Sequence, residues 1–419
     1  MAKVYHAEIF GLREAKYEWL NKHNIKNVKW NKLEPYGEFY LYIPQDAKLQ
    51  SKYQKFQKIT EIFPINSIGV VTSRDHFIFD IEINKLINRL TIFFNQSISD
   101  DVIRISFKLK DTSGWKLTES RKNLLQGGFI KEKINNIFYK PFDLRKIYYE
   151  DKLIERSRKE VVKNIINLEN LCFIYTRSAT KQLPYNHIFV SNAAPLGRFF
   201  TDASCITYFS PLYLYPETDK KDLFSEHDPG EKTPNIKPEL FEELKTNFKK
   251  EITPEEIFYY IYALLYSNTY RTKYSEFLKI DFPRVPFTKD YNLFIRLGKL
   301  GEQLVDLHLH KSKELDKTIS KFPAAGNNKV EKPRFDPAQR NNGQIWINKE
   351  QYFDGIKEEV WQYQIGGYQV CDKWLKDRKE RTLTSEEIKT YCKIVTALSK
   401  TIELQKEIDK YYPEIEKSL

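Results

Sequence analysis

The chain has 419 residues, of which 41% are hydrophobic and 15% aromatic, so it holds enough apolar material for packed cores and is not an intrinsically disordered protein. Its formal net charge is +11, and a basic surface attracts polyanions, of which nucleic acid is the commonest inside cells. A lysine-rich composition can also arise without such a partner, so charge alone leaves nucleic-acid binding open.

Several classes of protein are excluded by what the sequence lacks. No stretch reaches the roughly 18 uninterrupted apolar residues of a membrane helix, and the start "MAKVYHAEIFGLREAKYEWL" has no apolar signal-peptide core. We therefore expect a cytoplasmic protein with no membrane partner. The four cysteines are scattered, which predicts reduced core residues. His308 and His310 are two apart on a predicted helix and point in different directions, so we expect no metal site there.

Residues 1–95 read as an α/β segment. A strand is predicted in "KVYHAEIFG", a helix in "LREAKYEWLNKH", and a strand pair in "VKWNKLEP" and "EFYLYIP". A short helix over 49–63 and a strand in "SIGVVTS" follow. Two or three strands around one helix do not close a sheet by themselves, so this segment is typical of the edge of a larger sheet.

Residues 96–216 contain short aromatic and β-branched runs split by polar loops, which predict an antiparallel or mixed β domain. The clearest runs are "NNIFYKPFDLRKIYYE", "LCFIYTRS", "NHIFVSN" and "PLYLYP". Arginine suits bidentate contact with phosphates and guanine edges, and packed aromatics would hold such side chains on a rigid base. The candidate DNA contacts in this region are Lys140, Arg145, Arg156, Arg158, Arg177, Lys181 and Arg198.

Each of these candidates also has a plainer interpretation. Asp143 can pair with Arg145 or another nearby basic group as a structural brace, and for any single residue this is the preferred interpretation. For the basic surface as a whole we favour DNA binding over a structural role. His187, just before a strand run, is more typical of a packing residue than of a site residue.

Residues 217–419 are predicted to be mainly helical after a polar linker over 217–239. Thr253 and Glu256 form a capping-box pattern at the start of one helix, and Thr384 and Glu387 form another at the start of the last helix, over 385–410. Further helices are expected over 271–279 and 288–313, and a strand in "IWIN".

The segment "IGGYQVCDKWLKDRKERTLT" combines a paired-glycine turn, an aromatic anchor and a basic run. Its candidate DNA contacts are Lys376, Arg378, Lys379 and Arg381, and we predict that replacing the two arginines with alanine weakens duplex binding with little loss of thermal stability. The alternative is an ordinary salt-bridged face, in which Asp377 and Glu380 neutralise the run.

Motifs for autonomous catalysis are missing. The sequence has no GxG, no Pro-Pro pair, no GxSxG and no HExxH, so no dinucleotide, amino-methyltransferase, hydrolase or zinc-protease signature can be drawn. A nuclease pattern formed by Asp228, Glu243 and Lys245 falls in a helical stretch and is weak. We expect no catalytic, cofactor-binding or metal-binding residue in this chain.

Six segments, in this order, carry a resemblance to a known family: "YKPFDLRKIYY", "ERSRKEVVKNII", "NHIFVS", "SPLYLYP", "TPEEIFYYIYALLYSNTYRTKYSEFLKIDFPRVPF" and "IGGYQVCDKWLKDRKERTL". The chain resembles the C-terminal specificity region of type ISP and related type IIG restriction–modification enzymes. Two positions depart from the family pattern: Ser157 stands in place of a proline and Ser210 in place of a phenylalanine.

The resemblance implies an α+β fold, with a mixed β-rich recognition domain, a mainly helical C-terminal half, and an N-terminal α/β remnant similar to the edge of a methyltransferase sheet. It also implies a module that reads a double-stranded DNA site for an adenine-N6 methyltransferase and a nuclease, carried in the same enzyme or in a separate chain. S-adenosylmethionine and Mg²⁺ would belong to those domains, with no cofactor in this chain. The alternative is a non-catalytic docking or scaffold subunit with a basic protein-binding surface.

Overall fold

The computed structural model describes residues 3–9, 11–35, 42, 46–179, 185–200, 205–216, 232–337 and 342–419. Contacts divide the chain into two compact units, Met1–Phe56 and Gln57–Leu419, which are taken here one at a time. The expected functional segments, with borders near residues 95 and 216, remain a prediction, because compactness separates only the first 56 residues from the rest.

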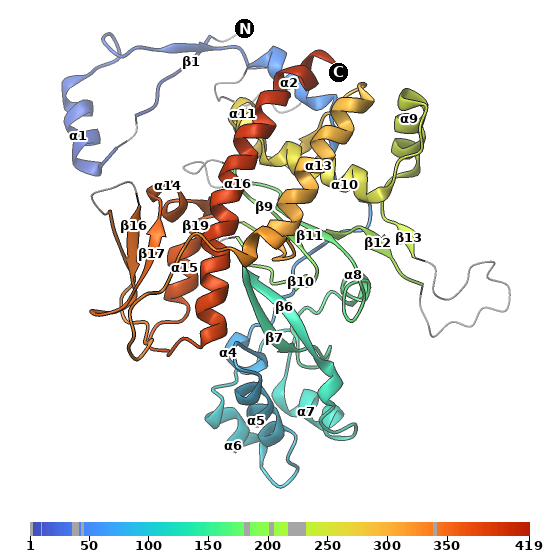
Figure 1. The fold of residues 1–419 in the computed structure, drawn as a ribbon, viewed down its shortest axis with the longest axis vertical. Coiled ribbons are helices and arrows are strands. Elements are labelled where there is room, and N and C mark those ends of the chain that lie inside the picture. Colours follow the sequence, from blue (N-terminus) through green and yellow to red (C-terminus); the bar gives the residue numbers. More distant parts are fainter. Residues whose placement is uncertain are drawn as a thin grey trace, which may run out of the picture. The chain divides into compact units, whose positions relative to one another are not determined.

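The first unit contains one antiparallel strand pair and two helices (Figure 1). Its elements are β1 (Val4–His6), α1 (Arg13–Lys22), β2 (Asn31–Leu33) and α2 (Ala47–Gln54). The predicted first strand and helix are confirmed, and Val4 lies opposite Leu33 in the pair. Most of the expected strand over 38–44 lies outside the described residues.

Two four-stranded sheets form the β-rich part of the second unit. The first has the order β10-β6-β7-β5, from Ala194–Pro195, Ile134–Lys140, Asp143–Tyr148 and Phe79–Asp80. The second has the order β4-β11-β8-β9, from Ser67–Ile68, Thr207–Pro211, Cys172–Thr176 and Ile188–Ser191. The β10–β6 pair is parallel and the others are antiparallel, so the predicted mixed β region is confirmed.

The run read as one packed strand around Pro141 is instead a hairpin. Strands β6 and β7 are joined through Pro141 and Phe142, and Phe142 adopts the left-handed backbone conformation, with φ +61°. Proline fits this place because it has no N–H to donate to a strand ladder. The hairpin brings Lys140 opposite Asp143 at its closed end.

Short helices alternate with β4 and β5 between residues 59 and 125, a region in which no helix was predicted beyond residue 63. They are α3 (Ile59–Ile62), α4 (Asp75–Ile78), α5 (Ile83–Phe93), α6 (Asp100–Ser106) and α7 (Leu117–Leu125). Leu86, Leu90 and Phe93 of α5 are fully buried at helical spacing. Residues 96–125 therefore hold two helices and no strand, and the longer strands of both sheets follow them, whereas the short edge strands β4 and β5 precede them.

The remaining small elements complete the second unit. They are β3 (Gln57–Lys58), η1 (Lys131–Lys133), α8 (Lys159–Val162), β12 (Tyr213–Leu214), β13 (Thr233–Pro234), β14 (Arg284–Val285), η2 (Lys313–Asp316), β15 (Arg334–Asp336), β16 (Gly343–Trp346), β17 (Tyr352–Ile356), α14 (Glu358–Trp361), β18 (Gln364–Ile365), β19 (Tyr368–Gln369) and α15 (Val370–Lys376). The predicted paired-glycine turn joins β18 to β19, and Gly366 has φ +64°.

The mainly helical character of the C-terminal half is also confirmed (Figure 1). Its main helices are α9 (Pro238–Phe248), α10 (Pro254–Tyr266), α11 (Asn268–Lys273), α12 (Ser275–Leu278), α13 (Tyr291–His308) and α16 (Ser385–Lys417). Both predicted capping boxes form, at Thr253 with Glu256 and at Thr384 with Glu387. Helices α10 and α13 pack closely at Gly301, where an added Cβ would lie 1.9 Å from the Tyr259 carbonyl oxygen.

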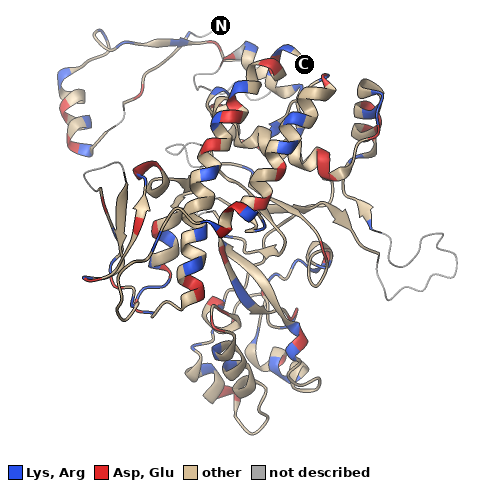
Figure 2. Cartoon of the chain, viewed as in Figure 1, with Lys and Arg blue, Asp and Glu red and all other residues tan. Residues whose placement is uncertain are grey.

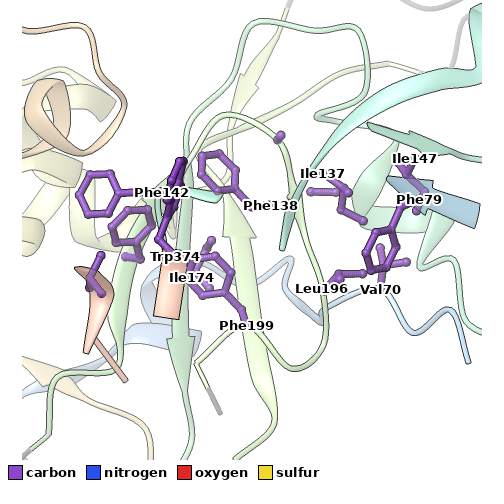
Figure 3. Packing of buried hydrophobic residues seen from close by; sticks show 14 of the residues in the cluster. Val70, Phe79, Ile137, Phe138, Phe142, Ile147, Ile174, Leu196, Phe199 and Trp374 are labelled. Atoms are coloured by element: carbon purple, nitrogen blue, oxygen red, sulfur yellow. The ribbon is translucent and has the colours of Figure 1, made fainter. Parts of the chain in front are cut away.

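One hydrophobic cluster connects the first sheet with β8, β9, β16, β17, α15 and α16. Figure 3 shows side chains of this cluster and labels Phe142 of the hairpin turn and Trp374 of α15, both of which are at most 6% exposed. All four cysteines are free and buried, as predicted. The arginines and lysines of the basic segments lie around this packed cluster.

Candidate nucleic-acid interface

The basic run of "KWLKDRKERT" contains a buried arginine. The Arg378 side chain donates from Nη2 to Asp143 Oδ1 at 3.1 Å and from Nε to Glu387 Oε1 at 3.2 Å. Its guanidinium carbon lies 3.4 Å from the centroid of the Trp374 ring, and the residue is 4% exposed. Arg378 therefore joins β7, α15 and α16 as an internal brace. The burial and the partners of its donors argue against the expected DNA contact, which stays untested.

Asp143 is the anion at the centre of this brace. Besides Arg378 it accepts from Arg145, at 2.8 Å from Nη2, and Arg145 stacks on Tyr139 with 3.6 Å between guanidinium and ring centroid. Burial alone would raise the pKa of Asp143, but the two guanidinium groups outweigh burial and hold the pKa below its usual value. Arg145 is thus the structural partner of Asp143 that the alternative interpretation predicted, which argues against its expected DNA contact.

Most of the other charges in the run are paired at the surface. Lys376 pairs with Asp372 at 2.6 Å, and Arg381 pairs with Glu82 at 3.3 Å and Glu387 at 3.2 Å. Lys379 is exposed and has no ion pair within the described part of the chain. Figure 2 shows basic and acidic positions interspersed along α16, where lysines pair with glutamates three positions away. Because these charges are paired, the net charge of +11 is not concentrated on α16.

A groove of about 780 Å³ lies in the second unit, and we call it the basic groove. It is lined by Ile68, Val70, Val71, Thr72, Ser73, Asp75, His76, Tyr139, Lys140, Arg156, Leu196, Gly197, Arg198, Cys205, Ile206, Tyr368 and Lys373. Four of these residues are basic, one is acidic, and two are tyrosines. Cations combined with aromatic rings are the composition that nucleic-acid surfaces favour.

Backbone hydrogen bonds tie three distant segments together to build this groove. Val70 N donates to Pro195 O at 2.9 Å, and Gly197 N donates to Val70 O at 2.8 Å. On the other side, Val71 and Arg156 form an antiparallel bridge through both of their N–H groups. Val70 and Val71 thus place the Arg156 segment and the Leu196–Arg198 segment on opposite sides of one short strand-like stretch.

Glycine makes this approach possible. An added Cβ at Gly69 would lie 2.6 Å from the Leu196 carbonyl carbon, and one at Gly197 would lie 3.2 Å from Gly69 O. An isolated glycine within a β-branched run is a known sign of close backbone approach. Gly69 in "SIGVVTS" was therefore a signal in the sequence that we did not use to locate the groove.

Arg156 and Arg198 are the two accessible cations of the basic groove. Both residues are exposed, and neither makes an ion pair within the described residues. Lys140, by contrast, is 7% exposed, and its ammonium group donates to the backbone carbonyl of Arg198 and to the Tyr368 hydroxyl. Lys140 therefore holds the Arg198 segment, and its burial argues against its expected role as a direct DNA contact.

Arg158 lies beside the basic groove, in a second hollow of about 590 Å³ that Arg156 also lines. Its backbone is left-handed, with φ +62°, and its buried Nε has no hydrogen-bond partner among the described residues. Burial, and then the charge of Arg156, lower the pKa of Arg158. A strained, half-buried and incompletely bonded guanidinium keeps this residue a candidate contact.

The remaining candidates from the sequence are Arg177, Lys181 and His187. Arg177 is 64% exposed at its side chain and lies 3.5 Å from Asp281, away from the basic groove. Lys181 lies outside the described residues. His187 is fully buried, and burial followed by the charge of Arg271 lowers its pKa to about 4, which confirms it as a packing residue.

The described ranges contain no group of three or more His, Cys, Asp or Glu side chains placed to hold a metal ion. Every helix in these ranges is too short or too polar to span a lipid bilayer.

The family model for the Type ISP C-terminal specificity domain matches residues 61–407. The chain belongs to this family. The match begins just before β4 and ends within α16, so it includes the basic groove and the brace at Arg378. No curated protein matches the chain.

Solved structures with the same fold come from larger proteins. The first is a DrdV–DNA complex, with a TM-score of 0.71 and 19% identity over 97% of this chain and 43% of that chain. The Type ISP restriction–modification enzyme LlaBIII bound to DNA gives 0.68 and 20% identity over 90% of this chain and 25% of that chain. A nuclease-deletion mutant of the Type ISP enzyme LlaGI with a DNA substrate mimic gives 0.65 and 18% identity over 97% and 33%. The chain therefore spans less than half the length of each.

Proposed function

We propose that this chain recognises a short sequence in double-stranded DNA as the specificity region of a restriction–modification enzyme. The observation that carries the proposal is the match of residues 61–407 to the Type ISP specificity domain. The solved structures of similar fold were determined in complex with DNA or a DNA substrate mimic, which supports the same partner for this chain.

The basic groove is the surface we assign to the duplex. Arg156 and Arg198 would contact phosphates, because they are exposed guanidinium groups without a carboxylate partner in the described residues. Their backbones are fixed by the hydrogen bonds to Val71 and from Lys140, so ordering of these segments adds no backbone entropy cost when they bind. Arg158 and Lys379 would add contacts beside it.

The chemistry would come from other domains. We propose that an adenine-N6 methyltransferase using S-adenosylmethionine, and a nuclease using Mg²⁺, act at the site that this chain selects, in the same enzyme or in a separate chain. The strand pair and helix of residues 1–56 would add to the edge of the methyltransferase sheet.

A salt titration of duplex binding tests the proposal against a docking subunit that meets an acidic protein. We expect an affinity for duplex DNA that falls linearly on logarithmic axes as salt rises, with a slope of about −0.9 for each phosphate neutralised. Absence of measurable duplex affinity at low salt, from a chain that unfolds cooperatively, would contradict DNA recognition and favour the docking subunit.

A further inference from the structure

One wall of the basic groove is the segment from Thr72 to His76, and it is anchored from inside. Thr72 and Arg74 are each 2% exposed, whereas Ser73, Asp75 and His76 are exposed. The two buried side chains anchor the segment to the interior, and the three exposed side chains are polar and face solvent. The segment therefore holds polar side chains in fixed positions at the groove.

Arg74 is the strongest of these anchors. It donates from Nη1 to the Leu153 carbonyl oxygen at 2.7 Å and from Nη2 to Glu155 Oε2 at 3.0 Å. Its guanidinium carbon also lies 3.8 Å from the centroid of the Trp115 ring. Both terminal nitrogens of Arg74 thus hold the segment, and at 2% exposure the residue is shielded from a ligand.

One carboxylate oxygen of Asp75 accepts a hydrogen bond, and the other accepts none within the described residues. The Thr72 hydroxyl donates to Oδ1 in a short hydrogen bond, and the left-handed backbone of Ser73, with φ +57°, lets the chain turn between the two residues. Within the described part of the chain, Asp75 makes no ion pair and Oδ2 accepts no hydrogen bond. An oriented acceptor therefore lines the basic groove.

A carboxylate in this position opposes phosphate binding. The basic residues of the groove, Lys140, Arg156, Arg198 and Lys373, attract a polyanion, while Asp75 repels it. An anion in a surface for DNA is useful where it meets a hydrogen-bond donor, and the donors on base edges are exocyclic amino groups. The carboxylate is therefore better suited to accept from a base amino group than to meet the phosphate backbone.

In the major groove, cytosine and adenine present these amino groups beside different neighbouring atoms. Cytosine offers its N4 amino group as a donor, which a carboxylate accepts well. Adenine places the acceptor N7 beside its N6 amino group, and that acceptor repels a carboxylate but suits an amide, which both donates and accepts. A carboxylate therefore favours cytosine, and an amide in the same place favours adenine.

We propose that Asp75 is a specificity-determining residue that accepts a hydrogen bond from the N4 amino group of one cytosine in the recognised sequence. This inference rests on the proposed function, namely that the chain binds duplex DNA in the basic groove. It assigns base reading to the Thr72–His76 segment and phosphate contact to Arg156 and Arg198.

Selection of bound duplexes from a random pool, with the full chain and with Asp75→Asn, tests this assignment. Asn keeps the size of the side chain and an oxygen that can accept from Thr72. We expect the wild-type motif to contain a cytosine whose preference is lost, or replaced by adenine, in the variant, with discrimination at that position falling about 5- to 150-fold. Asp75→Ala should lose the preference without gaining adenine.

The matched control is Asp101→Asn, which removes an exposed carboxylate of α6 outside the groove and should leave the motif unchanged. An unchanged motif in Asp75→Asn, with affinity raised equally for all duplexes, would overturn the inference, because Asp75 would then only repel phosphates. A change at a position other than cytosine would overturn it too. Recovery of no motif by the wild-type chain would overturn the proposed function itself.

Discussion

Replacing Arg378 with alanine removes the cation that joins Asp143 to Glu387. The two carboxylates come from β7 and α16, and Asp143 is 1% exposed. Without Arg378, Asp143 keeps only Arg145 as an ion-pair partner, and Trp374 loses the guanidinium that stacks on its ring. The variant therefore leaves a buried negative charge that is incompletely compensated.

The expected loss of stability follows from these contacts. Removing one partner of a buried ion pair costs about 3–5 kcal/mol, a range that includes the penalty for the charge left behind. For a unit on the order of 360 residues, an unfolding entropy of about 2.1 cal/mol/K per residue converts about 4 kcal/mol into a fall in Tm of about 5 °C. This reverses the prediction from sequence that the arginine could be removed with little loss of stability.

Urea unfolding and thermal melting of the full chain measure the effect, and Lys379→Ala is the matched control. Lys379 is the next residue, is exposed and has no ion pair in the described residues, so its removal should change stability by less than about 0.5 kcal/mol. Equal stability of the Arg378 variant and this control would refute the brace. A loss of duplex affinity in a variant of unchanged stability would instead restore Arg378 as a DNA contact.

Three further outcomes are expected. The folded pKa of Asp143 is lowered, so the stability that Asp143 contributes is complete above an unfolded pKa of about 3.9 and is lost as pH falls through the folded pKa. Urea midpoints measured below about pH 4 should show this loss. In Arg378→Ala the loss should begin at higher pH, because one of the cations that lower the pKa is gone. Arg156→Ala should weaken binding to all duplexes and reduce the salt slope by about 1, whereas Arg334→Ala, outside the groove, should not. Gly301→Ala should cost about 1–3 kcal/mol by urea unfolding, because its Cβ would meet a facing backbone oxygen, while Gly298→Ala, whose Cβ has 3.7 Å to its nearest neighbour, should be tolerated.

Features set by neighbouring residues were predictable from the sequence. The capping box at Thr384 and Glu387 depends on residues three apart, and the paired-glycine turn at Gly366 depends on backbone freedom at one position. Both appear in the structure where the sequence placed them. The short aromatic strands were predictable for the same reason, since an aromatic and β-branched run between polar loops indicates a packed strand.

The charged sites were less predictable, because their partners are remote. Arg378 meets Asp143 across 235 positions of sequence, so a count of nearby acids could not show that the arginine is buried. The same Glu387 that caps α16 also accepts from Arg378 and Arg381, which local pattern reading treats as separate features. Arg156 and Arg198 were candidates from the start, but only the backbone pairing through Val71 and Val70 brings them to one groove.

The central claim is that this chain reads a DNA sequence and does not merely attract polyanions. Selection of duplexes bound by the wild-type chain at physiological salt, followed by sequencing, tests that claim most directly, because phosphate contacts alone give no sequence preference. The account predicts that one short motif is recovered and that scrambling it weakens binding at least about a thousandfold. Duplexes bound with equal affinity whatever their sequence would contradict it.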